Sequence, residues 1–460
     1  MSDDGLTASI EKMRGEGLPD VAIDTFKHYY ERLREGETGM LPESGIEPVG
    51  DLVTADDLPE GGTDALDRTV IVKLNGGLGT SMGMTKAKSL LEVKGDLTFL
   101  DVIVRQVLEM RKRHDARLPL VLMNSFATRD DTVAALVKYG DLEVDVPVDF
   151  VQGRVPKIRT DDLQPVEWPD NPRQEWAPPG HGDIYTSLVT SGTLDALLDA
   201  GYEYAFVSNS DNLGAVLDPR IVAWFAGEEL PFAMEVTERT DADKKGGHIA
   251  RMREDGRLVL RETAQTPDED LDSLQDTGRH RWMNTNNLWI NLRALEQTLE
   301  ERDGVLGLPM IVNRKNVDPG DKSTPEVFQL ETAMGAAIGV FDGAAAIAVS
   351  RRRFSPVKTT EDLLGVRSDA YALTGDFHVQ LASERDGPPV IDLDDDYFKL
   401  IRDFDARFRA GPPSLLECER LTVEGDVAFG ASVVVRGTVT VRQEGEGQLR
   451  IPSGAELAGG

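Results

Sequence analysis

Cysteine is almost absent from this sequence of 460 residues: Cys418 is the only one. A single thiol cannot form a disulfide within the chain, and disulfide-stabilised proteins are found mainly in oxidising compartments. The opening residues, Met-Ser-Asp-Asp-Gly-Leu-Thr, contain neither a basic segment nor an apolar segment of the kind that directs export. We therefore expect a cytoplasmic protein.

Long apolar runs and positive charge are also scarce. The most apolar long stretch, residues 335–349, is interrupted by Asp342, whereas a membrane-spanning helix needs about 20 predominantly apolar residues. The 81 acidic residues outnumber the 50 lysines and arginines, so the formal net charge is −31. Because surfaces that bind nucleic acid need clustered Lys and Arg, we expect neither a membrane nor a nucleic acid as partner. We interpret the acid excess as a solvated surface rather than as salt adaptation.

Glycine, by contrast, is concentrated in one loop that follows an apolar run. After the apolar run at residues 70–74, the sequence places four glycines and then two lysines: Gly76, Gly77, Gly79, Gly83, Lys86 and Lys88. Glycine allows positive φ and lets several backbone N–H groups approach an anion, and lysine adds mobile charge. A Walker A loop is excluded because it needs Lys-Ser or Lys-Thr directly after its last glycine. The loop predicts a polyphosphate cradle, with an ordinary strand-to-helix turn as the alternative.

Strands alternate with helices after this point. Apolar runs at residues 70–74, 118–123 and 202–207 are each followed by a helical pattern, which predicts a parallel sheet covered by helices. Between residues 230 and 350 the pattern becomes mixed, with some strands expected to be antiparallel. Because ligands bind beyond the carboxyl ends of parallel strands, the glycine loop and the segment after Val207 should share one edge.

The tail has a period of six residues. Leu421, Val427, Val433 and Val439 recur at this spacing, as do Val423, Phe429, Val435 and Val441, with small residues at a fixed phase. This pattern is typical of a parallel β-helix. Ordinary alternating strands are the alternative, because a period of two also generates a spacing of six. A short β-helix here would serve packing or subunit contact.

Oxygen-bearing side chains follow the strand at residues 202–207: Asn209, Ser210, Asp211 and Asn212. A carboxylate at this place suits Mg²⁺, which prefers carboxylate, water and phosphate oxygens, and the asparagine amides suit sugar hydroxyls. The alternative is that Asn and Asp only form the turn.

Four further places carry candidate side chains. Gly180 and His181 lie in a Pro-Pro-Gly-His-Gly loop, where glycine allows close approach and histidine can donate to a phosphate or a base edge. Asn286 belongs to a run of amides before a strand, and Glu262 is a candidate hydroxyl acceptor. Lys358 follows Arg351-Arg-Arg and Pro356 and precedes an expected helix N-cap at Thr359 or Thr360, a setting that favours anions. The alternative readings are a structural histidine and solvated charges.

Seven motifs in one order carry a resemblance to a known family: Leu74-Asn-Gly-Gly-Leu-Gly-Thr-Ser-Met-Gly83, Val-Gln152-Gly-Arg-Val-Pro-Lys-Ile, Pro179-Gly-His-Gly-Asp-Ile-Tyr, Val207-Ser-Asn-Ser-Asp-Asn-Leu-Gly, Asn284-Thr-Asn-Asn-Leu-Trp, Gln329-Leu-Glu-Thr-Ala-Met-Gly-Ala-Ala and Pro356-Val-Lys-Thr-Thr. From about residue 26 to the tail, the sequence resembles the eukaryotic-like family of UTP–glucose-1-phosphate uridylyltransferases, also called UDP-glucose pyrophosphorylases. One departure is Met-Thr-Lys-Ala between Gly83 and Lys88, where the family more usually has Cys-Lys-Gly-Pro, so Lys86 has no assigned role.

The resemblance implies an α/β fold with a Rossmann-like, GT-A-like mixed sheet flanked by helices and a short C-terminal left-handed parallel β-helix. The corresponding segments would be an N-terminal helical segment at residues 1–50, a catalytic nucleotidyltransferase domain at residues 51–370 and a C-terminal domain at residues 371–460. The C-terminal domain would also offer a surface for self-association.

The resemblance also implies site residues. Those expected at the nucleotide are Leu74, Asn75, Gly76, Gly77, Lys88, Gln152, Gly180, Asp211 and Lys358. Those expected at the sugar phosphate are His181, Asn209, Glu262 and Asn286. Asp211 would bind the Mg²⁺ cofactor, and Lys88, Lys358 and Asp211 would be catalytic.

The implied reaction joins UTP and glucose 1-phosphate into UDP-glucose and pyrophosphate. A phosphate oxygen attacks the α-phosphorus in line, and no general base is needed because the nucleophile is already an anion. Three alternatives stay open: another sugar 1-phosphate or N-acetylhexosamine 1-phosphate as substrate, a UDP-sugar-dependent glycosyltransferase, and a catalytically silent nucleotide sensor.

Overall fold

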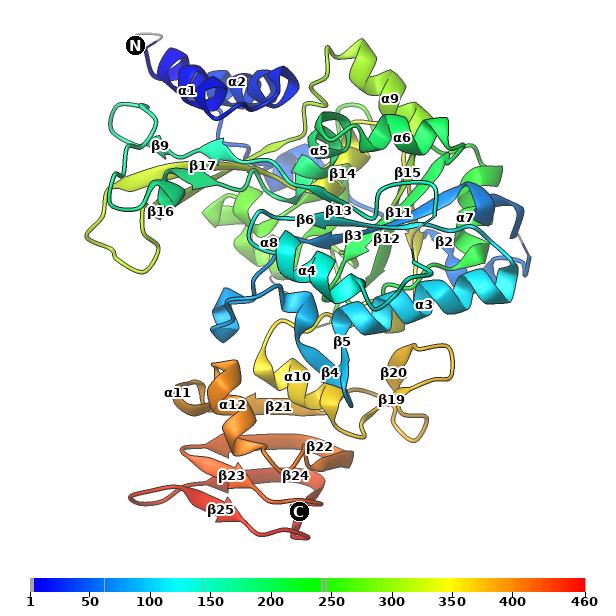
Figure 1. Ribbon diagram of the computed structural model, residues 1–460, viewed down its shortest axis with the longest axis vertical. Helices are drawn as coiled ribbons and strands as arrows, with labels where there is room; N and C mark the ends of the chain where they lie inside the picture. Colours follow the sequence, from blue (N-terminus) through cyan, green and yellow to red (C-terminus); the bar gives the residue numbers. More distant parts are fainter. Residues whose placement is uncertain (1–3, 62, 143, 241–242, 245, 460) are drawn as a thin grey trace.

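The computed structural model describes residues 4–61, 63–142, 144–240, 243–244 and 246–459. It is a mixed α/β structure with the sheet at its centre, two helices at the N-terminal end and a stack of strands at the C-terminal end (Figure 1). No helix in these described ranges is both long enough and apolar enough to cross a membrane.

The central sheet joins parallel and antiparallel strands in the order β2-β18-β12-β15-β11-β3-β6-β7. Its strands are β2 (Val53–Thr54), β3 (Thr69–Asn75), β6 (Leu120–Asn124), β7 (Asp149–Val151), β11 (Tyr204–Asn209), β12 (Phe232–Glu238), β15 (Trp282–Asn291) and β18 (Ala345–Ala348). Strands β7, β6, β3 and β11 are parallel, as predicted, whereas β15 runs antiparallel to both β11 and β12. Three strands extend the sheet through β15: β1 (Ile46–Pro48), β13 (His248–Met252) and β14 (Leu258–Arg261).

Helices cover both faces of this sheet because its strands are apolar on both sides. Val70 and Val72 of β3 point to one face and pack with α5 (Ile184–Thr190), α6 (Thr193–Asp199) and α9 (Leu292–Glu301). Ile71 points to the other face, which is covered by α3 (Phe99–His114), α4 (Arg129–Leu136) and α7 (Pro219–Gly227). Continuous apolar strands of this kind are typical of a sheet buried between two helical layers.

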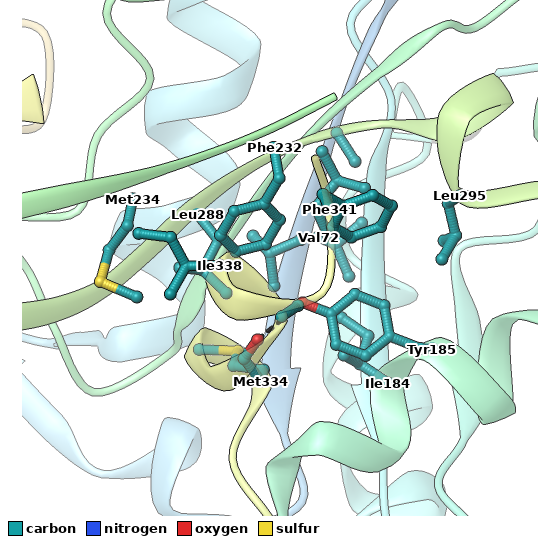
Figure 2. Packing of buried hydrophobic residues seen from close by; sticks show 14 of the residues in the cluster. Val72, Ile184, Tyr185, Phe232, Met234, Leu288, Leu295, Met334, Ile338 and Phe341 are labelled. Carbon is teal, nitrogen blue, oxygen red and sulfur yellow. Dashed lines mark hydrogen bonds between the residues drawn. The ribbon is translucent and has the colours of Figure 1, made fainter. Parts of the chain in front are cut away.

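The core on the first face also includes the segment that follows β17 (Glu326–Thr332). Figure 2 shows Tyr185 of α5 beside Phe341 and Ile338, with its hydroxyl directed at the carbonyl of Met334. The hydroxyl donates to this carbonyl at 2.7 Å. Phe232 of β12 stacks on Phe341 with ring centroids 5.7 Å apart. This packing fixes the 3₁₀ segment Met334–Gly339 against α5.

The N-terminal helices pack on a second, smaller sheet. Helices α1 (Asp4–Gly15) and α2 (Asp20–Arg34) bury Phe26, Tyr29 and Tyr30, at the helical spacing seen in the sequence. Their apolar sides contact β16 (Met310–Asn316) and β17 (Glu326–Thr332), which pair with β9 (Ile158–Arg159). The pair of β8 (Val155–Pro156) and β10 (Trp176–Ala177) completes this part. Elsewhere, β4 (Glu92–Lys94) pairs with β5 (Leu97–Thr98) beside residues 360–367, and α8 (Leu271–Gln275) is a short helix between β14 and β15.

The C-terminal strands confirm the burial pattern of the six-residue period. Leu421, Val427, Val433 and Val435 are fully buried, and Gly425 adopts a positive φ of 83°. The parallel sheet has the order β21 (Val390–Leu393), β22 (Ser414–Glu424), β24 (Val434–Arg442), β26 (Glu456–Ala458), and a second parallel pair joins β23 (Val427–Phe429) to β25 (Leu449–Ile451). The remaining elements here are α10 (Thr360–Arg367), α11 (Asp395–Phe398), α12 (Ile401–Arg407) and the hairpin of β19 (Tyr371–Leu373) and β20 (Val379–Leu381).

One buried cluster belongs mainly to this end of the chain, and it includes side chains from α10 through β24 together with Phe99 and Val102 of α3. The C-terminal strands therefore share their core with the start of α3, so the packing does not end sharply at one residue. The domain limits given by the resemblance stay predictions.

Candidate active site

The carboxyl edge of the sheet brings together two segments that lie far apart in the sequence. Strands β3 and β11 pair in parallel, with Leu74 opposite Asn209. The backbone N–H of Ser210 continues this pairing by donating to the carbonyl of Leu74 at 3.1 Å. The glycine loop and the segment 209–212 therefore leave the same edge, as the alternation of strands and helices predicted.

Two of the four loop glycines adopt left-handed conformations. Gly79 and Gly83 have φ values of 64° and 70°, whereas Gly76 and Gly77 lie outside the left-handed region that glycine allows. At Gly76 the need is space, because a Cβ atom would lie 2.6 Å from Oε1 of Gln152. Nothing lies within 4 Å of the corresponding position at Gly77.

The loop presents backbone donors to this open side. In the described part of the chain, the N–H groups of Gly77, Leu78 and Gly79 have no protein acceptor. The loop is nevertheless fixed, because the N–H of Lys88 donates to the carbonyl of Gly77 at 2.9 Å. A fixed loop with several free N–H groups is an anion-binding geometry.

Lys88 and Asp211 form an ion pair across this edge. The ammonium Nζ of Lys88 lies 2.6 Å from Oδ2 of Asp211, and the two side chains retain 14% and 24% of their accessible surface. The predicted catalytic lysine and the predicted metal ligand are therefore in direct contact. Both groups remain accessible enough to exchange this contact for a ligand.

The segment that ends at Lys358 lies directly beside Asp211. The N–H of Val357 donates to the carbonyl of Asp211 at 3.0 Å, and Pro356 forms a β-bridge with Asn212. Thr359 is the N-cap of α10, as predicted, through a capping box with Asp362. Lys358 itself is exposed, and its ammonium group makes no hydrogen bond or ion pair with the described residues.

Gln152 and the loop at Gly180 are joined by a residue that the sequence reasoning did not single out. Asp183 accepts hydrogen bonds from the N–H of Gly153 and the hydroxyl of Ser187, both at 2.6 Å. Burial raises the pKa of this carboxyl to about 6, and the two donors oppose the shift. Asp183 thereby links the segment of Gln152 to that of His181. In the sequence, the position of Asp183 in His-Gly-Asp, two residues after His181, could have indicated this role.

The ring of His181 is oriented by the core described above. Its Nδ1 accepts the N–H of Met334 at 3.0 Å, and the carbonyl of Met334 accepts the Tyr185 hydroxyl (Figure 2). The ring retains accessible surface, yet desolvation by the surrounding protein lowers the pKa of His181 to about 4. At neutral pH the imidazole is therefore neutral, and with Nδ1 as acceptor it carries its proton on Nε2.

Glu262 directly follows β14, whereas Asn286 lies within β15 of the same sheet. Burial raises the pKa of Glu262, while the charge of Lys358 acts in the opposite direction, so these two groups lie within electrostatic reach of one another. Asn286 has a positive φ of 57°, which is uncommon for a residue other than glycine. Asn284 holds it in place, because its Oδ1 accepts the Asn286 N–H at 2.8 Å.

Other predicted residues are engaged elsewhere. The amide of Asn75 is buried and donates to Asn124 and Thr132, so only its backbone faces the loop side. Leu74 packs against the core. The basic cluster expected to concentrate charge is partly neutralised, since Arg351 pairs with Asp243 and Arg353 pairs with Glu235.

Comparison with known proteins agrees with this geometry. The family model described as UTP–glucose-1-phosphate uridylyltransferase matches residues 23–436. The chain belongs to this family. UTP–glucose-1-phosphate uridylyltransferases from Solanum tuberosum and Hordeum vulgare are 44% and 41% identical to it, over 85% and 99% of this chain and 80% and 95% of theirs. A UDP-glucose pyrophosphorylase variant from Leishmania major, solved with UDP-glucose, matches with a TM-score of 0.93 at 46% identity and covers 100% of this chain and 98% of that one.

Membership of this uridylyltransferase family makes the chain a nucleotidyltransferase and raises the question of a metal ion. Within the described ranges, no group of three His, Cys, Asp or Glu side chains could hold one. Mg²⁺ usually binds through one or two carboxylates together with water and substrate phosphates. The accessible carboxylate of Asp211, beside a loop of free N–H groups, fits that donor set.

Proposed function

We propose that this family member forms UDP-glucose and pyrophosphate from UTP and glucose 1-phosphate. The observation that carries the proposal is that three parts of the family pattern meet at one sheet edge: the glycine loop, the Lys88–Asp211 pair and the segment of Lys358.

In the proposed reaction the loop places the triphosphate. The N–H groups of Gly77, Leu78 and Gly79 bind phosphate oxygens, and the Gly76 backbone with Gln152 borders the base. His181 donates from Nε2 to the sugar phosphate, and Glu262 and Asn286 accept and donate at sugar hydroxyls. These contacts hold the attacking oxygen in line with the α-phosphorus, which is the main contribution that positioning makes to a reaction between two anions.

Charge is supplied locally by the chain. Lys88 and Lys358 lie on either side of Asp211 and neutralise negative charge that develops on the phosphate oxygens. Asp211 would hold Mg²⁺, which when bound would neutralise phosphate charge and orient the triphosphate. Both lysines retain accessible surface, so they can turn to the substrate without unfolding their elements.

A coupled assay of pyrophosphate release tests the proposal. Purified protein is incubated with UTP, Mg²⁺ and a panel of sugar 1-phosphates, then with a panel of nucleoside triphosphates. We expect release with UTP and glucose 1-phosphate, and none when Mg²⁺ is replaced by excess chelator. Preference for N-acetylglucosamine 1-phosphate or galactose 1-phosphate would favour the alternative uridylyltransferases. Absence of pyrophosphate from every pair would exclude the proposal.

We further propose roles for the parts of the chain. Residues 51–370 carry the catalysis, the helices within residues 1–50 support the loop at His181, and residues 371–460 pack beneath the site. The 18-residue offset between β22 and β24, which places Leu421 opposite Val439, corresponds to three six-residue units. This offset supports a short left-handed β-helix, whose last strand offers an edge for self-association.

A cytoplasmic location agrees with the single buried cysteine.

A further inference from the structure

A buried carboxylate lies beneath the active site without touching any of the residues assigned to substrate. Glu235 on β12 is fully buried. Its two oxygens accept from Nε and Nη2 of Arg353 at 2.7 and 2.6 Å, from Nδ2 of Asn287 at 2.9 Å and from Nε1 of Trp289 at 3.1 Å. Four donors from two segments therefore converge on one side chain.

Glu235 also controls the β-bulge that carries Asn286. The register between β12 and β15 shifts at this point, where Glu235 faces Asn287 and the next residue faces Asn284. The carbonyl of Glu235 accepts the Thr285 hydroxyl at 2.7 Å, and its carboxylate accepts from Asn287. The residues on both sides of Asn286 are thus held by Glu235. A bulge is a common means of redirecting a side chain next to an active site.

Arg353 extends this control to the other side of the site. Its carbonyl accepts from Nδ2 of Asn212 at 3.1 Å and more weakly from Asn287 at 3.4 Å. Oδ1 of Asn212 in turn accepts the N–H of Ser355 at 2.9 Å. Four residues after Arg353, the N–H of Val357 bonds to the carbonyl of Asp211. The chain between Arg353 and Lys358 is therefore fastened to the turn that presents Asp211.

We propose that the Glu235–Arg353 ion pair is a positioning unit that sets Asn286, Asp211 and Lys358 in one mutual arrangement. The inference rests on the proposed function, since these three residues act on the sugar phosphate and the triphosphate. Stability alone does not explain the pair: a buried ion pair is often no more stable than well-packed apolar residues of similar volume, whereas loss of one partner is strongly destabilising. An apolar pair, however, cannot accept the four hydrogen bonds that converge on the Glu235 carboxylate.

The test separates positioning from folding by comparing single and double variants. Glu235→Gln leaves the charge of Arg353 unpaired, so we expect both a lower melting temperature and a lower kcat. Glu235→Leu combined with Arg353→Met removes both charges. We expect this double variant to recover most of the melting temperature while kcat stays at least tenfold below that of the unaltered protein and KM for glucose 1-phosphate rises. Recovery of both melting temperature and kcat in the double variant would overturn the inference.

Two milder variants keep the inference testable if the double variant fails to fold. Arg353→Lys retains the positive charge but loses the bidentate hydrogen bonds to Glu235. Thr285→Val removes only the hydroxyl that fixes the bulge. For Thr285→Val we expect KM for glucose 1-phosphate to rise at least threefold while the affinity for UTP, measured by calorimetry without the sugar phosphate, is unchanged. Equal effects on both substrates, or none on either, would contradict it.

The matched control is the Arg407–Asp426 pair in the C-terminal part, which is partly buried with a 2.9 Å contact. Arg407→Met with Asp426→Leu should leave both KM values and kcat unchanged. If the unaltered protein is inactive, the proposed function is contradicted. If the unaltered protein is active and the double variant at Glu235 and Arg353 is equally active and stable, only the positioning unit is contradicted.

Discussion

Lys88 and Asp211 form an ion pair although 123 residues separate them in the sequence. In the proposed reaction the triphosphate and Mg²⁺ compete for both partners, so the pair is a resting contact that substrate replaces. Lys358, in contrast, is exposed on a segment fixed to Asp211 only through its backbone. When substrate binds, Lys88 therefore loses its ion pair with Asp211, whereas Lys358 loses no ion pair within the described chain.

Replacement of Lys358 by alanine should lower kcat while leaving the fold intact. The ammonium group makes no hydrogen bond or ion pair within the described chain, so its removal costs little stability. Loss of one donor to transition-state charge typically costs about 10²–10³-fold in kcat. Steady-state kinetics at saturating UTP and glucose 1-phosphate measure this, with the exposed Lys112→Ala on α3 as control. An unchanged kcat would remove Lys358 from the mechanism.

Lys73 should make the free energy of unfolding depend on pH. Burial lowers its pKa to about 7, although the amine donates to the Ser208 hydroxyl and the Ala215 carbonyl. Between pH 7 and the ordinary lysine value of 10.5, the unfolded chain binds one more proton at this residue than the folded chain. This group's contribution to stability therefore rises with pH across that window, by up to about 1.4 kcal/mol per pH unit.

Urea unfolding of Lys73→Met measures this contribution. The variant lacks the titrating group, so its stability relative to the unaltered protein should be greatest near pH 7 and decline by pH 9.5. Other groups titrate equally in both proteins and cancel in the difference. Lys112→Met, at an exposed position, should show no such trend. Parallel stability curves for Lys73→Met and the unaltered protein would mean that the buried amine is not neutral.

At the scale of elements, the fold requires some glycines of the loop, whereas Gly77 serves only the proposed binding of phosphate. Gly79 needs its left-handed backbone and Gly76 needs the space beside Gln152, but Gly77 has ordinary backbone geometry and open space around it. The conformation of Gly77 can therefore be adopted by other residues. Its role in the proposed function is only to let phosphate approach.

Gly77→Ala should leave the melting temperature unchanged and raise KM for UTP about tenfold or more, because the added methyl group occupies the space through which phosphate approaches. Thermal unfolding and steady-state kinetics check the two parts. Gly375→Ala is a matched control, since Gly375 also has open space and an ordinary φ but lies in the β19–β20 turn. A loss of stability without a change in KM would show that the loop glycine is structural.

Secondary structure could be predicted where a pattern depended on near neighbours in sequence. The period of six predicted the burial of Leu421 and Val433, and the N-cap was expected at Thr359 or Thr360 and lies at Thr359. The spacing Thr128-x-x-Asp131 also predicts a capping box at the start of α4, but this box is absent, because the Thr128 hydroxyl instead accepts the N–H of Ser125. A competing local donor cannot be recognised from spacing alone.

At the scale of the whole molecule, the last strand β26 has one edge that no described strand covers. An uncovered strand edge is a ready surface for pairing with a second chain. The proposed self-association therefore has a specific location, and Leu457 lies half-buried in that strand.

Light scattering after size-exclusion chromatography should detect a mass above that of a single chain at micromolar concentration. Leu457→Lys should return the mass to that of one chain, because a charged side chain at the edge disfavours pairing. Val137→Lys, at an exposed valine directly after α4, should not. A single-chain mass at every concentration would leave these strands with a packing role only.

The sequence by itself determined the family, the glycine loop and the residues that follow strands, because each depends on residue types within a few positions of one another. It also determined the alternation that places Leu74 and Asn209 at one edge. Only the tertiary structure decided that Lys88 pairs with Asp211, that Arg353 turns inward to Glu235 and that Asn286 sits on a bulge. Glu235 occurs in an alternating strand pattern that suggests a solvated charge, and its burial follows from neighbours that the chain supplies more than 50 residues away.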